Sequence, residues 1–494
     1  ILFSKYILEN PEIIRFKNVN FRKNKVISLT SLYLLMLTIV YSIIYFSFSA
    51  SSDFSSTSFF KVLYSVTMAI QYISVFYVGT YFVVTSMFQE RDKETFDFLR
   101  MSTIEREVLA VGKLLGPNIF IYFLVLIMTP FIFLFSIFGD VPLYNFFGSY
   151  LNIFIFGILY HSIGLFLGTT LTNTKSNSPA GLAIGVPIFS NFMTAFSSSS
   201  YINPFYNVFA IFSKNIKTNP YINFYSYPFP DFIIMFIIIS FIVFWCMLFI
   251  VRKMDYDQNK IMTKKQSLTF VSMFQIILLG LTWNLFLSEV SAAIYIFMTI
   301  NLLVQLLIII NLTPDKDDTI VFLNKDKTNL NSIFDSKSSL NSLITLNSVI
   351  ILIFCLLGSI GDFFVNGKID GLMRSIFMYI PFLLFSLMYT NFFYLSNLVF
   401  VKKQAYIIYA MLVLSFFIPI PIAGITKGSS NIIENFLINP LVAFANLTVK
   451  DSSSVFNLVN LHNIIQLSII LIIILVLNVI SRSKKEEIKK KYVI

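Results

Sequence analysis

The sequence predicts an all-α, polytopic membrane protein with about twelve transmembrane helices in two six-helix halves and both termini in the cytoplasm. Three observations lead to this fold class, of which composition is the first. The 494 residues are 56% hydrophobic and 12% charged, with a mean hydropathy of +0.79. A soluble globular domain carries about 25% charged residues, so this chain has too little polar surface to cover a water-soluble body of its size. The other two observations are the length of the apolar runs and the distribution of basic residues.

The apolar runs are long enough to cross a bilayer as helices, which need about 20 residues each. In lipid the backbone polar groups must be satisfied within the segment, and strands of a barrel would alternate in polarity, which these runs do not. The predicted spans are 26–48, 62–88, 119–138, 146–171, 180–196, 232–251, 270–287, 292–310, 343–360, 376–399, 406–423 and 461–480.

The basic residues set the orientation, because cytoplasmic loops carry an excess of Lys and Arg. With both termini inside, only seven of the 36 Lys and Arg residues fall in outside loops. Losing or gaining one span would scramble this division, so the number of spans is predicted to be even. The net charge of +11 then reflects membrane topology, and no nucleic-acid partner is expected.

The spans and charges divide the chain into five parts. The last part is a basic tail that is predicted to anchor the final helix against anionic headgroups, which makes membrane lipids a partner. The parts are a basic, amphipathic cytoplasmic segment (1–25), a first six-helix half (26–251), a cytoplasmic linker (252–269), a second six-helix half (270–480) and the tail (481–494).

Two sequence echoes indicate that the halves are repeats. Residues 94–99 read Glu-Thr-Phe-Asp-Phe-Leu after the second span, and residues 318–323 read Asp-Thr-Ile-Val-Phe-Leu after the eighth. An Asn-Pro pair follows at 203–204 and again at 439–440, each in the outside loop before the last span of its half. Two matches in the same order predict a duplication and a pathway lined by both halves.

The segment 89–113 mixes both charges with apolar residues. No Gly or Pro interrupts residues 80–111, so the second span is predicted to continue as a helix beyond the membrane. Lys93 and Asp97 lie four apart, while Phe96 and Leu99 share a neighbouring face. The segment is therefore either a docking helix or a solvated juxtamembrane loop that only sets topology, because mixed-charge loops of that second kind are common.

A pattern in this segment favours the docking helix. Glu90-Arg91, Thr95, a turn at Leu99 and Gly112-Lys113 at the opening of the third span follow one another at the spacing seen in ABC-2 type permeases, the membrane subunits of ATP-binding cassette transporters. The segment resembles their cytosolic coupling segment. Further similarity lies in Asn10-Pro11-Glu12 with Arg15, in residues 164–180, and in the second half at 314–323 and 439–440; Asp97 and Arg100 depart from the apolar residues usual there.

This resemblance implies a separate ATP-binding subunit, present as a dimer, that docks on coupling segments 89–113 and 312–327. The chain has no Gly-x-x-x-x-Gly-Lys-Ser/Thr sequence, so ATP and Mg²⁺ are expected on the partner only, and no enzymatic residue or cofactor is expected here. The implied protein is an exporter subunit of the bacterial inner membrane. The implied contact residues are Glu90, Arg91, Glu94, Thr95, Phe98, Leu99, Asp315, Asp318, Thr319, Phe322 and Leu323.

Inside the predicted spans, the residues that stand out are those of helix packing, and no catalytic or metal site is predicted. Gly164 with Gly168, and Gly181 with Gly185, are small-xxx-small pairs that predict close helix packing. His161 is the one ionisable residue well inside a span, and it is predicted to bond a neighbouring helix or face the cytosolic cavity. No His-Glu-x-x-His pattern occurs, and no metal site is predicted.

Two other functions are also compatible with the sequence. A twelve-span secondary transporter would need buried acids or histidines for its relay, and the spans are poor in them. A non-transporting membrane scaffold would use the duplication only for assembly. The long outside stretches 197–231 and 424–460 offer room for an extracytoplasmic partner, and no residue selects a substrate.

Overall fold

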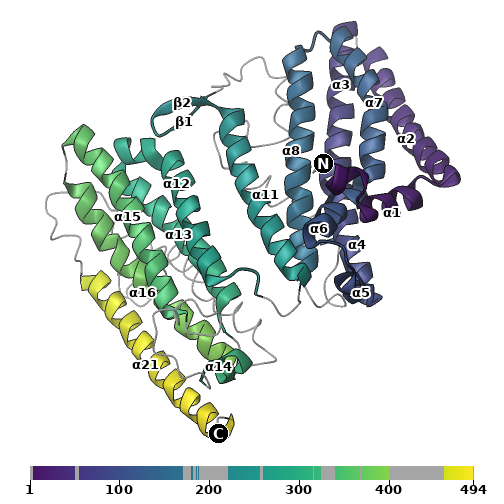
Figure 1. Ribbon diagram of the computed structural model, residues 1–494. Coiled ribbons are helices and arrows are strands. Elements are labelled where there is room, and N and C mark those ends of the chain that lie inside the picture. Colours follow the sequence, from purple (N-terminus) through teal and green to yellow (C-terminus); the bar gives the residue numbers. More distant parts are fainter. Residues whose placement is uncertain are drawn as a thin grey trace. The chain divides into compact units, whose positions relative to one another are not determined.

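The computed structural model describes residues 4–50, 55–170, 180–181, 185, 187, 221–255, 260–314, 316–323, 340–367, 369–399 and 461–492. In these residues the ordered elements are helices, together with one two-stranded hairpin (Figure 1). The chain divides into two compact units, one made of residues 1–222 and 229–261 and the other of residues 223–228 and 262–494. The division falls within the predicted linker, 252–269.

Nine helices in the described part of the chain are long and apolar enough to cross a membrane, which makes this a multi-pass membrane protein. They are Lys23–Ser49, Ser56–Asp92, Arg106–Phe138, Leu143–Thr170, Ile233–Asp255, Lys264–Ser288, Val290–Leu312, Asn341–Asn366 and Gly371–Val399. Each overlaps one predicted span. The predicted span 461–480 lies within a further helix, and the predicted spans 180–196 and 406–423 lie almost wholly outside the described residues. Twelve spans and cytoplasmic termini stay predictions.

The first unit is a bundle capped at one end by short helices. A buried aromatic and aliphatic cluster, including Tyr64, Met68, Tyr72 and Phe76, forms its core between α3, α7 and α8. Its elements are η1 (Ser4–Leu8), α1 (Pro11–Asn20), α2 (Lys23–Ser49), α3 (Ser56–Ile73), η2 (Ser74–Gly79), α4 (Thr80–Asp92), α5 (Thr95–Met101), α6 (Arg106–Leu115), η3 (Gly116–Asn118), α7 (Ile119–Phe138), α8 (Leu143–Thr170) and α11 (Asp231–Asp255).

A π-helical turn, η2, joins α3 to α4, and His161 of α8 lies against it. Its Nε2 donates to the carbonyl oxygen of Val75 at 2.9 Å, and its Nδ1 accepts from the hydroxyl of Tyr122 at 2.9 Å. Gly79 leaves room for the ring, because a Cβ there would lie 2.5 Å from Nε2. Of the two places predicted for His161, the structure shows the bond to a neighbouring helix.

Gly79→Ala is expected to lower the free energy of unfolding by about 1–3 kcal/mol, because the added methyl overpacks against a ring that is held by two hydrogen bonds. Gly148→Ala on α8 is the matched control, since a Cβ there meets no atom of the described residues within 4 Å beyond its own stretch of helix. The thermal midpoint of the detergent-solubilised protein measures both. Equal midpoints for the two variants would show that His161 does not need the space over Gly79.

The glycines predicted for helix packing lie in two environments. A Cβ on Gly164 would lie 2.7 Å from Thr80 Cγ2, and one on Gly168 would lie 3.2 Å from Met87 Cβ, so α8 approaches α4 closely at both. Gly181 and Gly185 are exposed, and a Cβ on Gly185 would meet no described atom within 4 Å. The described residues therefore show close packing only for the first pair.

The second unit is also a bundle, and amides and hydroxyls lie in its interior. Gln275 of α12 and Asn301 of α13 exchange hydrogen bonds of 2.5 and 3.1 Å while fully buried. Gln305 of α13 bonds Ser348 of α15 at 3.3 Å, so polar contacts join three helices. The helices are α12 (Lys264–Ser288), α13 (Val290–Leu312), α14 (Lys316–Leu323), α15 (Asn341–Asn366), α16 (Asp370–Val399) and α21 (Leu461–Tyr492).

One element departs from the predicted all-α class. Strands β1 (Tyr221–Phe224) and β2 (Tyr227–Pro230) form a hairpin. Its two turn residues, Tyr225 and Ser226, both have positive φ, as a tight two-residue hairpin turn requires. The tip packs on α12, where the backbone N–H of Tyr225 donates to Gly280 at 3.1 Å and its hydroxyl to Ile276 at 2.7 Å.

The long helices and one short helix follow a similar order in the two units, apart from η1 and α1, which precede the first long helix of the first unit, and the hairpin. Two long helical segments come first, a short helix follows, and two further long segments come next. After a stretch outside the described residues, each unit ends in one more long helix, α11 or α21. The short helices, α5 and α14, carry the two echoed sequences. The duplication itself stays a prediction.

Candidate functional site

The chain turns sharply where α4 ends and α5 begins. Glu94 takes the left-handed conformation, with φ of +57°, and so ends α4 instead of extending it. The Thr95 hydroxyl donates to the carbonyl oxygen of Glu90 at 3.2 Å and satisfies one of the carbonyls at the end of α4. The second span thus continues helically beyond residue 88, as predicted, but its helix stops at Asp92, and α5 is a separate short helix.

Phe96 attaches α5 to the bundle. Its side chain is buried in a cluster with apolar residues of α4, α6, α8 and α11, among them Val83, Leu109 and Leu165. The guanidinium of Arg91 lies 5.6 Å from the centroid of the Phe96 ring and donates to the backbone of Thr169. These contacts hold α5 in place on the end of the unit.

The other face of α5 is apolar and exposed. Phe98 is 72% exposed and Met101 is 79% exposed, three residues apart on one side of the helix. Leu99 is half-buried against the same cluster as Phe96. An isolated exposed apolar residue is ordinary, whereas two neighbours on a helix held by a buried anchor form a small contact surface. We call Phe98 and Met101 the α5 face.

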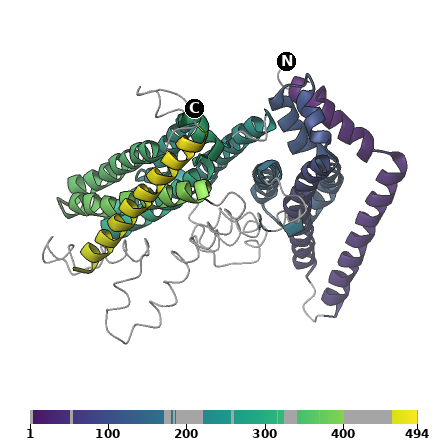
Figure 2. The ribbon, with the colours of Figure 1, turned by 90° about the horizontal axis from the view of Figure 1, so that it is seen from below.

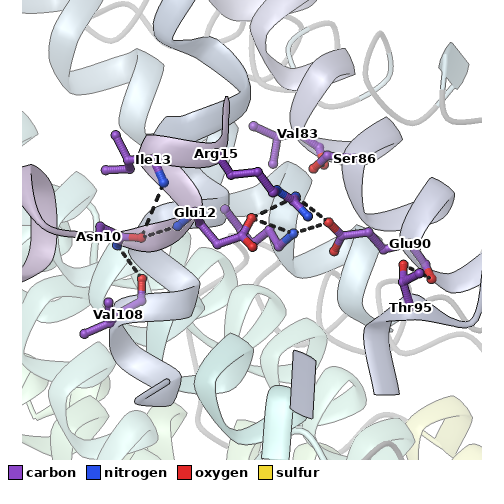
Figure 3. A network of polar contacts seen from close by, with 10 residues as sticks. Asn10, Glu12, Ile13, Arg15, Val83, Ser86, Glu90, Thr95 and Val108 are labelled. Atoms are coloured by element: carbon purple, nitrogen blue, oxygen red, sulfur yellow. Dashed lines mark hydrogen bonds and ion pairs between the residues drawn. The ribbon is translucent and has the colours of Figure 1, made fainter. Parts of the chain in front are cut away.

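A buried ionic network lies beside α5 and joins three helices (Figure 3). Lys113 of α6 is fully buried and pairs with Glu12 of α1 at 2.9 Å and with Glu90 of α4. Arg15 of α1 reaches the same two carboxylates at 2.8 and 2.7 Å. Two acids and two bases therefore balance. Burial of such charges is tolerated only when they are paired.

This network corrects the prediction for Glu90. The resemblance implies that Glu90 contacts an ATP-binding subunit, but its side chain is 10% exposed and is bonded to Arg15 and Lys113. Its role in the structure is to tie α4 to α1 and α6. It does not belong to an accessible docking surface.

The start of α1 packs on α6 at Gly112 and Lys113. The side chain of Asn10 caps α1 by accepting from Glu12 N at 3.0 Å, and it donates to Val108 O of α6 at 2.7 Å. A Cβ on Gly112 would lie 2.6 Å from Asn10 Oδ1 and 2.6 Å from Glu12 Cβ. The absence of a side chain at Gly112 therefore lets α1 pack closely on α6, and Lys113 neutralises Glu12 of α1.

Two exposed ion pairs extend this end of the unit. Lys5 lies 2.6 Å from Glu105, which joins η1 to the start of α6. Arg106 lies 3.0 Å from Asp255, which joins α6 to the end of α11. Exposed pairs of this kind contribute about 0–1 kcal/mol each, so they orient these segments more than they stabilise them.

The second predicted segment, around α14, has a different environment. Thr319 is buried, with its hydroxyl 3.4 Å from that of Tyr394, and Ile320 packs on Tyr394 and Leu398 of α16. The prediction of Thr319 as a surface contact is therefore wrong, because α16 covers it. Val321 is exposed, and Asp318 is half-buried.

The remaining predicted contact residues lie partly within and partly outside the described residues. Asp315 lies outside the described residues, as do the side chains of Phe322 and Leu323, whose backbones belong to α14. In the first half Glu94, Thr95 and Phe98 are exposed. Sequence reasoning missed Met101, although its spacing of three from Phe98 was a signal for a shared helix face.

No group of three or more His, Cys, Asp or Glu side chains in the described ranges is arranged to hold a metal ion. The site therefore consists of an apolar contact face, a buried anchor and a buried ionic network at one end of the first unit. No family model, curated protein or solved structure matches the chain.

Proposed function

We propose that this chain is the membrane-spanning permease subunit of an ATP-binding cassette transporter, an exporter in a bacterial plasma membrane. A separate ATP-binding subunit dimer docks on α5, and on α14 in the second half. The observation that carries the proposal is the α5 face, two exposed apolar side chains on a short helix that Phe96 anchors in the bundle. A solvated loop that only sets topology needs no such anchor.

Contacts around α5 can transmit a movement of this helix to α4, α6 and α1. A push on α5 is carried to α4 through Phe96 and through the Thr95–Glu90 bond. The pairs of Glu90 with Lys113 and Arg15 carry it on to α6 and α1. These elements therefore respond as one block when a docked subunit moves.

Two irregular turns separate the block of α1, α4, α5 and α6 from the long helices α3 and α7. The π-helical turn η2 separates α3 from α4, and the 3-10 turn η3, which contains Pro117, separates α6 from α7. Such turns inside long helices often mark hinges. In the proposed mechanism α3 and α7 change direction relative to the block at these two turns, so that movement at α5 opens or closes a pathway between helices.

Substitution of the α5 face tests the docking. Phe98→Asp with Met101→Asp is expected to reduce the amount of ATP-binding subunit that co-purifies by about tenfold or more, because burial of one such side chain contributes about 1.5–3 kcal/mol. ATP-dependent export is expected to fall with it. Both residues are exposed, so the thermal midpoint of the chain itself is expected to stay unchanged.

Phe364→Asp on α15 is the matched control, since Phe364 is 80% exposed and lies in a predicted outside loop. Full retention of the ATP-binding subunit by the α5 variant would contradict the docking. Transport that persists without any ATP-binding subunit and follows an ion gradient would identify a secondary transporter instead. Reversal of charge at Glu90 does not serve as a test, because it disrupts the buried network.

A further inference from the structure

A cavity of about 610 Å³ lies in the first unit between α1, α2, α4 and α7. Its volume is within the range of about 300–1,000 Å³ typical of ligand sites. Most of its walls are apolar or aromatic and include Tyr33, Phe82, Phe120 and Leu124. All its lining residues belong to one unit, so its shape does not depend on how the two units are arranged.

The cavity exists because α2 leans away from the bundle at its N-terminal end. Leu37 is the buried residue of α2, and the hydroxyls of Tyr41 and Thr67 bond at 2.8 Å and tie the later part of the helix to α3. Figure 2 shows α2 standing apart from its neighbours, with α1 turning away from its first residues. The first turns of α2, from Lys25 to Tyr33, line the opening.

Basic residues lie beside the cavity at the start of α2. Lys25 lines it and also lines an adjoining hollow of about 510 Å³ together with Arg22 and Lys23. All three side chains are exposed, and no acidic residue occurs among the described residues that line either space. Positive charge at a predicted cytoplasmic membrane surface attracts anionic lipid headgroups.

Polar groups also line the cavity. Thr85, Ser86 and Gln89 contribute to it from α4, and Ser74 contributes from η2. Polar and apolar side chains therefore both line the cavity, as an amphipathic ligand needs.

We propose that the first unit binds one anionic phospholipid here. The headgroup phosphate lies on Arg22, Lys23 and Lys25, and one acyl chain enters the apolar cavity between α2 and α7. The bound lipid fills the space that the lean of α2 leaves and so holds α1, the helix that carries two members of the buried ionic network. This site is independent of the proposed function, because it requires no ATP-binding subunit.

Native mass spectrometry of the full-length protein released from nanodiscs tests the site. Phosphatidylglycerol is expected to be retained as one tightly held molecule, in preference to phosphatidylcholine with the same acyl chains. Lys25→Gln is expected to weaken this binding about fivefold, and each further neutralisation at Arg22 or Lys23 by about the same factor. Leu124→Trp, which fills the cavity, is expected to displace the lipid while leaving the basic residues in place.

Two controls separate a built site from general surface charge. Neutralising Lys489, Lys490 and Lys491 in the tail removes the same number of charges and is expected to leave the tightly held lipid in place. Glycerol 3-phosphate carries the phosphate without acyl chains and is expected not to displace it. Equal retention of the two phospholipids would overturn the proposal. Retention that survives Leu124→Trp, or release by glycerol 3-phosphate, would overturn it as well.

Discussion

Lys113→Met is expected to lower the free energy of unfolding by about 3–5 kcal/mol, because removing one member of a buried ionic network leaves an uncompensated charge. Lys113 is fully buried between Glu12 and Glu90, and Arg15 alone then faces both carboxylates. Arg15 is 45% exposed, so solvent screens its contribution. The thermal midpoint and the urea midpoint of the solubilised protein measure the loss.

A second substitution tests whether charge balance causes this loss. Lys113→Met combined with Glu12→Gln restores neutrality, leaving Glu90 with Arg15, and is expected to recover part of the lost stability. Arg15→Met, at the exposed side of the network, is expected to destabilise less than Lys113→Met. A wild-type midpoint for Lys113→Met would contradict the network, and so would a double variant that is no more stable than the single one.

Phe96→Ala is expected to release α5 from the bundle. Truncation of a buried Phe costs about 3–5 kcal/mol, and a seven-residue helix without its anchor is too short to stay folded in water. Amide hydrogen exchange across residues 95–101 is expected to rise to the rate of an unstructured peptide. Binding of the ATP-binding subunit is expected to fall as well, although Phe98 and Met101 are unchanged.

Phe98→Ala is the control that distinguishes loss of the partner contact from loss of the Phe96 anchor. It is expected to leave amide exchange in α5 unchanged, because the Phe98 side chain is exposed, and to weaken only the association with the partner. Slow exchange across 95–101 in the Phe96→Ala variant would show that α5 is held by something other than Phe96.

Sequence alone predicted the membrane helices well, because the length of an apolar run depends on the bilayer and not on the partners of the helix. It did not predict what precedes them. The third predicted span, 119–138, coincides with α7, whereas α6 and η3 extend the helical segment back to Arg106, where Glu12 of α1 pairs with Lys113. That partner comes from a segment about a hundred residues earlier in the chain.

The environment of single polar residues could not be predicted in the same way. Glu90 lies in a run of charged residues that favours an exposed position, and only its tertiary partners on α1 and α6 permit burial. Thr319 is likewise covered by α16, which begins about fifty residues later. The hairpin turn at Tyr225-Ser226 lacks the Asn-Gly or Asp-Gly pair that signals such turns.

Photo-crosslinking from position 98 addresses the claim that a separate motor moves this chain through α5. A photoreactive amino acid replaces Phe98 in membranes of the host organism, and position 364 on α15 serves as the comparison. The expected product at position 98 is a crosslink to a polypeptide whose tryptic peptides include a Gly-x-x-x-x-Gly-Lys-Ser/Thr sequence. Crosslinks at position 98 to lipid alone, or the same products at both positions, would contradict it.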